Sequence, residues 1–142
     1  MSQIVRNLSE IARCGIQYRS DCLSEMGVKS CHISYLVQIC ENPGISQDQL
    51  SRLICINKSN VARQVAYLEK EGYITRKTCP CDKRITELYP TAKSTEILGS
   101  MYSIMHNWEA RLTQDMVPDE KENLTCLLKK MHPHAVSYMA ER

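Results

Sequence analysis

Cationic side chains gather in the middle of the chain. Between Arg52 and Arg84, eight lysines and arginines stand against three carboxylates, a net charge of +5. The whole chain carries +2, so the remaining residues together carry −3. Because cations beside a polyanion release its condensed counterions, a basic stretch between acidic arms indicates a surface that faces phosphate groups. An ordinary solvated face would carry the same charges, and helical phase separates the two interpretations.

One predicted helix within this stretch carries side chains that could bind DNA. Asn57 is a good N-cap, and Gly72 can adopt the left-handed conformation that ends a helix. Three apolar residues one turn apart predict its buried face: Val61, Val65 and Leu68. The opposite face then holds Ser59, Arg63, Ala66, Tyr67 and Lys70, with Asn60 at its edge. Serine, asparagine and arginine are donors that read base edges, although exposed polar helix faces are common.

Two thiols could add a redox or metal site to the same segment. Cys79 and Cys81 flank one proline and lie close in sequence to Lys83 and Arg84. Nearby positive charge lowers the pKa of a thiol and favours oxidation or capture of a soft metal. The spacing is not that of a zinc knuckle and no second pair follows, so a structural or incidental role is the alternative.

Signals for other chemistry are weak. His32 and His106 could meet, with Glu25 or a cysteine, to bind zinc, although a lone helical histidine is more often hydrogen-bonded or solvated. No glycine-rich phosphate loop, paired-histidine motif or nucleophile elbow occurs, so we expect no enzyme, no catalytic residues and no required cofactor. Five further cysteines on or beside predicted helix faces are expected to be small buried hydrophobes: Cys14, Cys22, Cys31, Cys40 and Cys55.

The first half of the scaffold is predicted to be helical. Apolar periodicity indicates a first helix from Ile4 to near Gly27, and Ser30 could cap a second helix that ends before residues 42–44. Ser46 and Gln49 have the spacing of a capping box at the start of a third helix. The inner face of that helix is predicted to be Leu50, Leu53 and Ile54.

The second half is predicted to contain one hairpin and two long helices. Residues 73–77 and 85–89 alternate as strands do, joined by a basic loop. Thr91 could cap the next helix, Pro118 could begin the last one, and Pro133 should break or kink it. The order predicts a mainly α fold with a small β-hairpin wing. We expect a winged helix-turn-helix domain at residues 30–90, with dimerisation helices at 1–29 and 91–142 whose apolar stripes are covered by a second copy.

Composition agrees with a folded protein that stays out of membranes. The chain is 43% hydrophobic and 24% charged, with a mean hydropathy of −0.35. Its longest uncharged stretch, residues 97–108, is shorter than the roughly 20 apolar residues that a bilayer span needs. Charged residues also interrupt any signal-peptide core near the N-terminus, so we expect a cytoplasmic protein with reduced thiols.

Two motifs together resemble the MarR family of bacterial and archaeal transcription regulators. The run from Asn57 to Ile74 looks like the family's recognition helix and its exit into the wing. Residues 82–84, Asp-Lys-Arg, look like its Asp-x-Arg wing signature. The resemblance covers nearly the whole chain and is strongest at residues 44–91. Pro90 stands where the family usually has leucine, and Ser94 where a glycine often follows.

The resemblance implies roles for individual residues. The arginine of the wing signature, Arg84, would enter the minor groove, while Asp82 would brace the wing. We assign base reading in the major groove to Ser59, Asn60 and Arg63. Lys58, Tyr67 and Lys70 are expected to bind phosphates. The remaining DNA-binding candidates are Arg76 and Lys83.

The resemblance also implies how such a protein works. It would be a homodimer that binds a pseudo-palindromic operator in double-stranded DNA. It is expected to be a repressor that a small-molecule, oxidant or metal signal releases from DNA. Two alternatives stay open: a thiol- or metal-responsive sensor acting through Cys79 and Cys81, and a winged-helix module that binds another protein instead of DNA.

Overall fold

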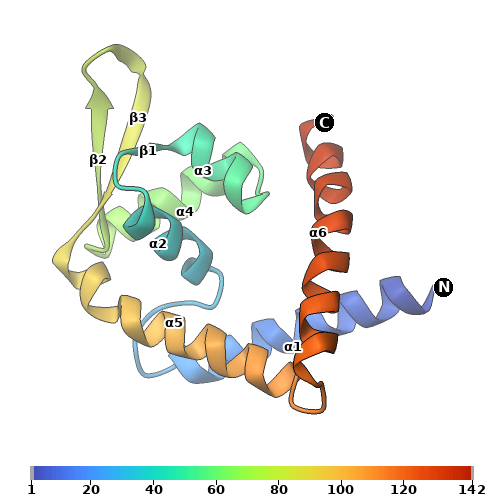
Figure 1. Cartoon of the computed structure of the whole chain (residues 1–142). Helices are drawn as coiled ribbons and strands as arrows, with labels where there is room; N and C mark the ends of the chain where they lie inside the picture. The colour runs from blue at the N-terminus through green and yellow to red at the C-terminus, as the bar shows by residue number, and fades with distance from the viewer. Residues whose placement is uncertain (1, 142) are drawn as a thin grey trace.

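The computed structural model describes residues 2–141, which form six helices and a three-stranded antiparallel sheet (Figure 1). The predicted fold class, mainly α with a β-hairpin wing, is confirmed. The elements in chain order are α1 (Gln3–Leu23), α2 (His32–Glu41), β1 (Ile45–Ser46), α3 (Gln47–Ile54), α4 (Lys58–Lys70), β2 (Ile74–Cys79), β3 (Asp82–Pro90), α5 (Ala92–Leu112) and α6 (Pro118–Ala140).

Several predicted helix ends are confirmed by their hydrogen bonds. Ser46 Oγ accepts from Gln49 N at 3.1 Å, and Gln49 Oε1 accepts from Ser46 N at 3.0 Å, which completes the capping box. Asn57 Oδ1 accepts from Asn60 N at 2.8 Å at the start of α4. Beyond the end of α4, Gly72 has a φ of 80°, a conformation that glycine adopts without steric cost.

Three other features of the helices differ from the predictions. Ser30 does not cap α2, which begins at His32 after Cys31 without a side-chain cap. Thr91 is the N-cap residue of α5, as predicted, but its side chain makes no capping hydrogen bond and its hydroxyl donates to the Gly72 carbonyl at 2.6 Å. Helix α6 continues through Pro133. The proline removes one backbone donor, and because its turn is exposed, water can reach the freed carbonyl.

The sheet is larger than the sequence pattern predicts. Strands β2 and β3 extend to Cys79 and Asp82, so most of the predicted loop lies in strands, although the register of the ladder is irregular after Thr78. Strand β1 was not predicted, because two residues are too few to show an alternating pattern. It pairs with β3 through Ile45↔Leu88 and gives the order β1-β3-β2.

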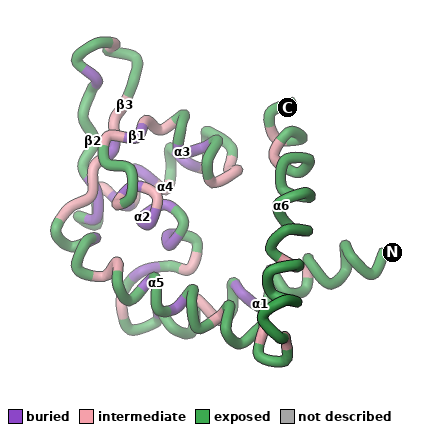
Figure 2. Tube along the Cα trace, in the orientation of Figure 1, coloured by how far each residue is buried: buried purple, intermediate pink, exposed green. Residues whose placement is uncertain are grey.

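The core lies among α2, α3, α4 and the base of the sheet, where the buried positions gather in Figure 2. The predicted inner face of α4 is confirmed, since Val61, Val65 and Leu68 are fully buried. The prediction for Leu53 is wrong: its side chain is 52% exposed, and Leu50 alone of the predicted α3 face is fully buried. The five cysteines expected to be core are exposed or half-buried in this chain.

The outer parts of α1 and α5, and all of α6, extend away from this core (Figure 1), to which α1 contributes Leu23 and α5 contributes Met101 and Ile104. Helix α5 packs along α1, whereas α6 contains no buried residue. Within residues 2–141, no helix combines the length and apolar character that crossing a membrane requires.

Candidate DNA-binding site

The outward face of α4 presents the predicted base-reading side chains. Ser59 and Arg63 are exposed and Asn60 is half-buried, on the side opposite the core face of the helix. Ser59 Oγ donates to the Asn57 side chain at 2.9 Å, and Arg63 Nη2 donates to Asn60 Oδ1 at 3.2 Å. These short bonds within the first two turns orient the donors while leaving them accessible.

Two lysines stand at the ends of this helix. Lys58 and Lys70 are both exposed. Lys58 Nζ lies 3.7 Å from Asp48 Oδ2, but the two side chains are 74% and 65% exposed, so the pair constrains the lysine little. Both ammonium groups are therefore available to an anion.

The tip of the hairpin holds an arginine in a fixed orientation. Arg84 donates from Nε and Nη2 to the two oxygens of Asp82, each at 3.1 Å, and its backbone N–H donates to Asp82 Oδ1 at 2.9 Å. These bonds hold the pKa of the Asp82 carboxyl below its usual value. The Arg84 side chain remains 90% exposed, and the neighbouring Lys83 is exposed too. The wing thus presents a planar donor fork that its own aspartate orients.

A second ion pair joins the wing to α4. Arg76, on β2, donates to Glu69 Oε1 from Nη2 at 2.8 Å and from Nε at 3.1 Å. The hydrogen bond from Arg76 lowers the pKa of Glu69. Arg76 was predicted as a DNA-binding residue, and in the structure its guanidinium fixes the hairpin against the helix through Glu69.

Tyr67 lies differently from the other candidates. It is half-buried, its ring stacks on His32 with centroids 5.1 Å apart, and Lys29 Nζ lies 4.7 Å from its centroid. The ring therefore packs α4 against α2 and the segment before it. Sequence reasoning missed this contact because the two residues share no periodic pattern.

The junction between wing and α5 contains another contact that sequence reasoning missed. Ser94 is fully buried and its hydroxyl donates to the Tyr73 carbonyl. Lys93 Nζ donates to the Glu71 carbonyl at 2.8 Å. Ser94 is one of the two departures from the family pattern, and that departure was the available signal that the position has a special environment.

The prediction that basic neighbours lower the thiol pKa at the wing tip is wrong for Cys79. Cys79 is buried and Cys81 is exposed. The side-chain hydrogen bond with Cys81, the side-chain hydrogen bond with Glu87 and burial all raise the pKa of the Cys79 thiol. These contacts favour the protonated form, which is the less reactive one.

The possible zinc site of His32 and His106 does not form in the part of the chain that the structure describes, and His32 is instead the hydrogen-bonded histidine of the alternative interpretation. His32 is buried, and Nε2 lies 2.8 Å from Gln64 Oε1. His106 is exposed on α5. Across residues 2–141, no group of three or more histidine, cysteine, aspartate or glutamate side chains is placed to hold a metal ion.

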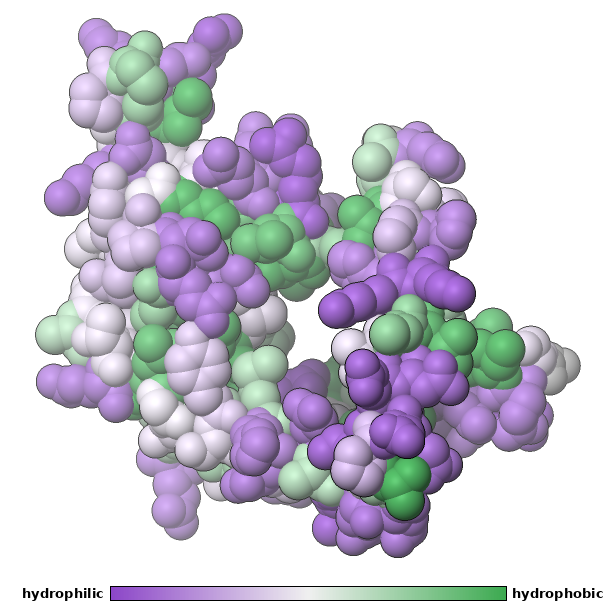
Figure 3. Space-filling model, viewed as in Figure 1, coloured by the Kyte–Doolittle hydropathy of each residue, from purple (hydrophilic) through white to green (hydrophobic). Residues whose placement is uncertain are grey.

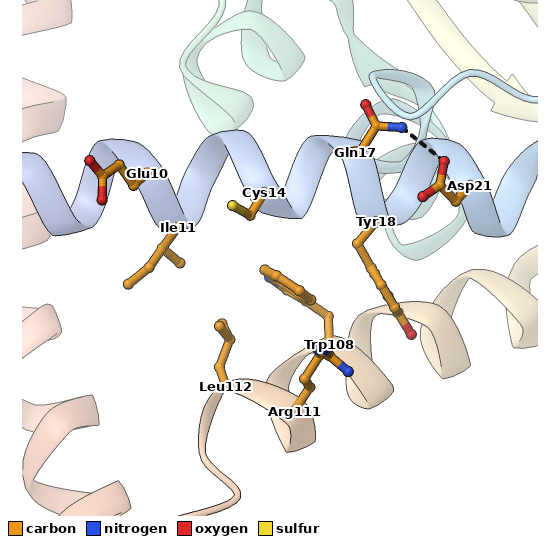
Figure 4. Close-up of a pocket in the computed structure, with 9 residues that line it drawn as sticks. All are labelled: Glu10, Ile11, Cys14, Gln17, Tyr18, Asp21, Trp108, Arg111 and Leu112. Carbon is orange, nitrogen blue, oxygen red and sulfur yellow. Dashed lines mark hydrogen bonds between the residues drawn. The ribbon is translucent and has the colours of Figure 1, made fainter.

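Two pockets lie outside the winged helix. One, of about 580 Å³, lies between α1 and α5, where Trp108 stacks on Tyr18 with centroids 5.0 Å apart and Cys14 and Arg111 complete the wall (Figure 4). Gln17 donates to Asp21 at 2.8 Å at its edge. The other, of about 620 Å³, has a largely apolar wall from α1, α5 and α6 that includes Leu8, Leu112, Leu124 and Leu128.

Together the three core helices, the hairpin and the exposed donors define a winged helix-turn-helix protein. A family model described as the MarR family matches residues 30–86. An uncharacterized HTH-type transcriptional regulator of Bacillus subtilis (strain 168), YybA, is 30% identical over 92% of this chain and 87% of its own. The chain belongs to the MarR family of transcriptional regulators.

Solved structures show the same architecture. A MarR protein from Peptoclostridium difficile superposes with a TM-score of 0.95 at 26% identity, covering 99% of this chain and 92% of that one. A MarR-family regulator from Listeria monocytogenes, crystallised with a 26mer DNA, superposes with a TM-score of 0.93 at 27% identity, covering 99% and 93%. These relatives are regulators of transcription, a class of protein distinct from enzymes.

Proposed function

We propose that this regulator is a homodimeric, sequence-specific repressor that binds double-stranded DNA at a pseudo-palindromic operator. The observation that carries the proposal is the exposed donor set: Arg63 with Ser59 and Asn60 on α4, and the oriented Arg84 fork on the wing. A module that binds proteins would have no need of this cationic surface. The likeness to the Listeria protein crystallised with DNA supports the same function.

The donor types suggest that different residues contact the major groove, the minor groove and the phosphates. Ser59, Asn60 and Arg63 would read base edges in the major groove, because α4 presents them together near its N-terminus. Arg84 would enter the minor groove, where negative potential concentrates. The Tyr67 hydroxyl would bind a phosphate, since its ring is packed inside. The other cations would also bind phosphates: Lys58, Lys70, Arg76 and Lys83.

The second copy in this proposal covers the terminal helices. Large apolar side chains are exposed on α1, including Ile4, Val5 and Leu8, and on α6, including Leu127 and Leu128. Figure 3 shows hydrophobic surface over the N-terminal part of α1, beside α6. Apolar surface of this extent on a single chain marks a site that another molecule covers. Residues 1–29 and 91–142 would therefore form the dimer interface, and residues 30–90 would bind DNA.

The α1–α5 pocket makes a small molecule the favoured release signal. Its stacked aromatic rings and a nearby guanidinium could hold a planar, partly polar compound. An oxidant or metal acting at Cys79 and Cys81 is the weaker alternative, because hydrogen bonds favour the protonated Cys79 thiol. A regulator of this kind acts where the chromosome is, in the cytoplasm.

Selection of duplexes from a random library tests the proposed function. The purified protein should enrich an inverted repeat, and Arg63→Ala should lose more affinity for the enriched duplex than for random DNA, since base contacts carry sequence information. Arg6→Ala removes the same charge from an exposed position on α1 and serves as the control, with sedimentation to show that this variant keeps the oligomeric state of the wild type. Enrichment of no sequence, or equal losses on both duplexes, would contradict the proposal.

Sedimentation tests the dimer. Leu128→Lys places a charge in the proposed interface, so the variant should sediment as a monomer while the wild type sediments as a dimer. A monomeric wild type would remove the second copy from the proposal.

A further inference from the structure

A buried histidine contacts the recognition helix, α4, on a side that faces α2. His32, the first residue of α2, is 1% exposed. Its Nε2 lies 2.8 Å from Gln64 Oε1 on α4, and its Nδ1 accepts from the Lys29 backbone N–H at 3.4 Å. One ring nitrogen therefore donates and the other accepts, which is the pattern of a neutral imidazole protonated on Nε2.

The same ring is enclosed by aromatic side chains. Tyr67 of α4 stacks on it, with planes 24° apart, and Tyr35 of α2 meets it edge-on with centroids 6.5 Å apart. Gln64 and Tyr67 lie one helical turn apart on α4, and Gln64 directly follows Arg63 of the outward face. The imidazole thus contacts two residues of the helix that presents the base-reading donors.

A protonated ring does not fit this site. Protonation of Nδ1 would point an N–H at the Lys29 N–H and remove the acceptor. The charged group facing the ring is Lys29, whose ammonium lies over Tyr67, while burial raises the pKa of the Tyr35 phenol that meets the ring edge-on. Burial, reinforced by the charge of Lys29 and opposed by the Gln64 hydrogen bond, lowers the pKa of His32 from 6.5.

We propose that His32 is a positioning residue for DNA binding: its neutral ring holds α4 through Gln64 and Tyr67, and protonation of the ring releases the helix and weakens the grip on DNA. The proposal rests on the proposed DNA-binding function. It makes the affinity of the regulator for its operator sensitive to acid without any contact between His32 and DNA.

The sign and size of the effect follow from linkage. In the unfolded chain the imidazole titrates near 6.5, and in the folded chain it titrates lower, so this histidine stabilises the fold fully above that pH. The stabilisation is lost as the pH falls toward the folded pKa. If the DNA-bound form excludes the protonated ring, Kd rises up to about tenfold for each pH unit below the folded pKa.

The experiment measures Kd for the library-selected duplex between pH 7.5 and pH 5 at fixed salt, alongside NMR titration of the His32 ring. The wild type should lose affinity on acidification, and α4 amide signals should shift with the same midpoint as the ring. His32→Gln should bind less tightly and lose this acid dependence. His106→Gln, at an exposed histidine, should keep the wild-type dependence.

A second variant keeps the ring in place. Gln64→Glu puts a carboxylate at Nε2, which favours the protonated imidazole, so the midpoint should move to higher pH. An unchanged midpoint, α4 signals that ignore the ring titration, or His32→Gln with the wild-type acid dependence would each overturn the proposal. If the wild type binds no selected duplex at pH 7.5, the DNA-binding function fails, and the NMR titration still decides whether His32 holds α4.

Discussion

Replacing Arg84 with alanine removes the guanidinium from each wing tip. The side chain is 90% exposed and contacts Asp82 of its own strand, so folding and dimerisation should not change. Loss of one specific arginine contact costs about 1–3 kcal/mol, and the proposed dimer has two wings, so binding should weaken by about 2–6 kcal/mol. We expect the lower end, roughly a 30-fold rise in Kd, because Asp82 already occupies the fork and its carboxylate lies close to the DNA.

Fluorescence anisotropy with the selected duplex measures this change at fixed salt and then across a salt series. Arg84→Lys keeps the charge but loses the planar fork. If Arg84 enters the minor groove in the orientation that Asp82 imposes, lysine should restore only a small part of the affinity. If Arg84 binds a phosphate, lysine should restore most of it, and alanine should reduce the salt slope by about 0.9 per lost contact.

Arg6→Ala controls for the general loss of a positive charge. It lies in the first turn of α1, outside the winged helix but within the proposed dimer interface, so its oligomeric state is checked by sedimentation; with that state unchanged, Kd should stay within about twofold of wild type at the same salt. Arg84→Ala with an affinity as close to wild type as that of this control would refute the assigned role of the wing arginine.

Three further predictions concern stability, measured by urea denaturation. Ser94→Ala removes one of the two donors to the Tyr73 carbonyl, which keeps the Thr91 N–H at 3.1 Å, so the free energy of unfolding should fall by about 0.5–1.5 kcal/mol; no loss would mean that the buried hydroxyl bond adds nothing to stability. Cys55 has a φ of 57°, in the left-handed region that glycine adopts without strain. Cys55→Gly should therefore stabilise the fold by about 0.5–1 kcal/mol, and Cys55→Val should destabilise it. A valine variant more stable than the glycine variant would contradict backbone strain at this position. A Cβ at Gly15 would lie 3.1 Å from Trp108 Nε1, so Gly15→Ala should forfeit the roughly 1 kcal/mol that alanine normally adds to a helix and should alter the fluorescence of the single tryptophan. A full gain with unchanged fluorescence would show that the indole moves freely.

Local signals in the sequence predict the parts of the fold whose contacts are local. The Ser46–Gln49 box and the Asn57 cap each join groups three residues apart, so the printed sequence already contains both partners. The outward face of α4 follows from its core face by helical phase, as Val65 illustrates. The hairpin was found for the same reason, since adjacent strands alternate.

Contacts between distant segments set the remaining features, and these the sequence does not reveal. Strand β1 exists because Ile45 finds Leu88 across the sheet. Leu53 fits an apolar helical pattern but faces outward, since α3 is short and already buries Leu50. Nearby lysines suggested a reactive Cys79, whereas its actual neighbours are hydrogen-bonding groups that favour the thiol.

The recognition helix shows how both kinds of contact combine in one site. Its buried strip packs on the core, one flank is held by Gln64 and Tyr67 against His32, and its C-terminal turn is tied to the wing by Glu69 and Arg76. The outward donors are placed by these three attachments together. Substitutions at the hidden attachments should therefore change DNA affinity without touching DNA, whereas substitutions of the outward donors should change it without altering the fold.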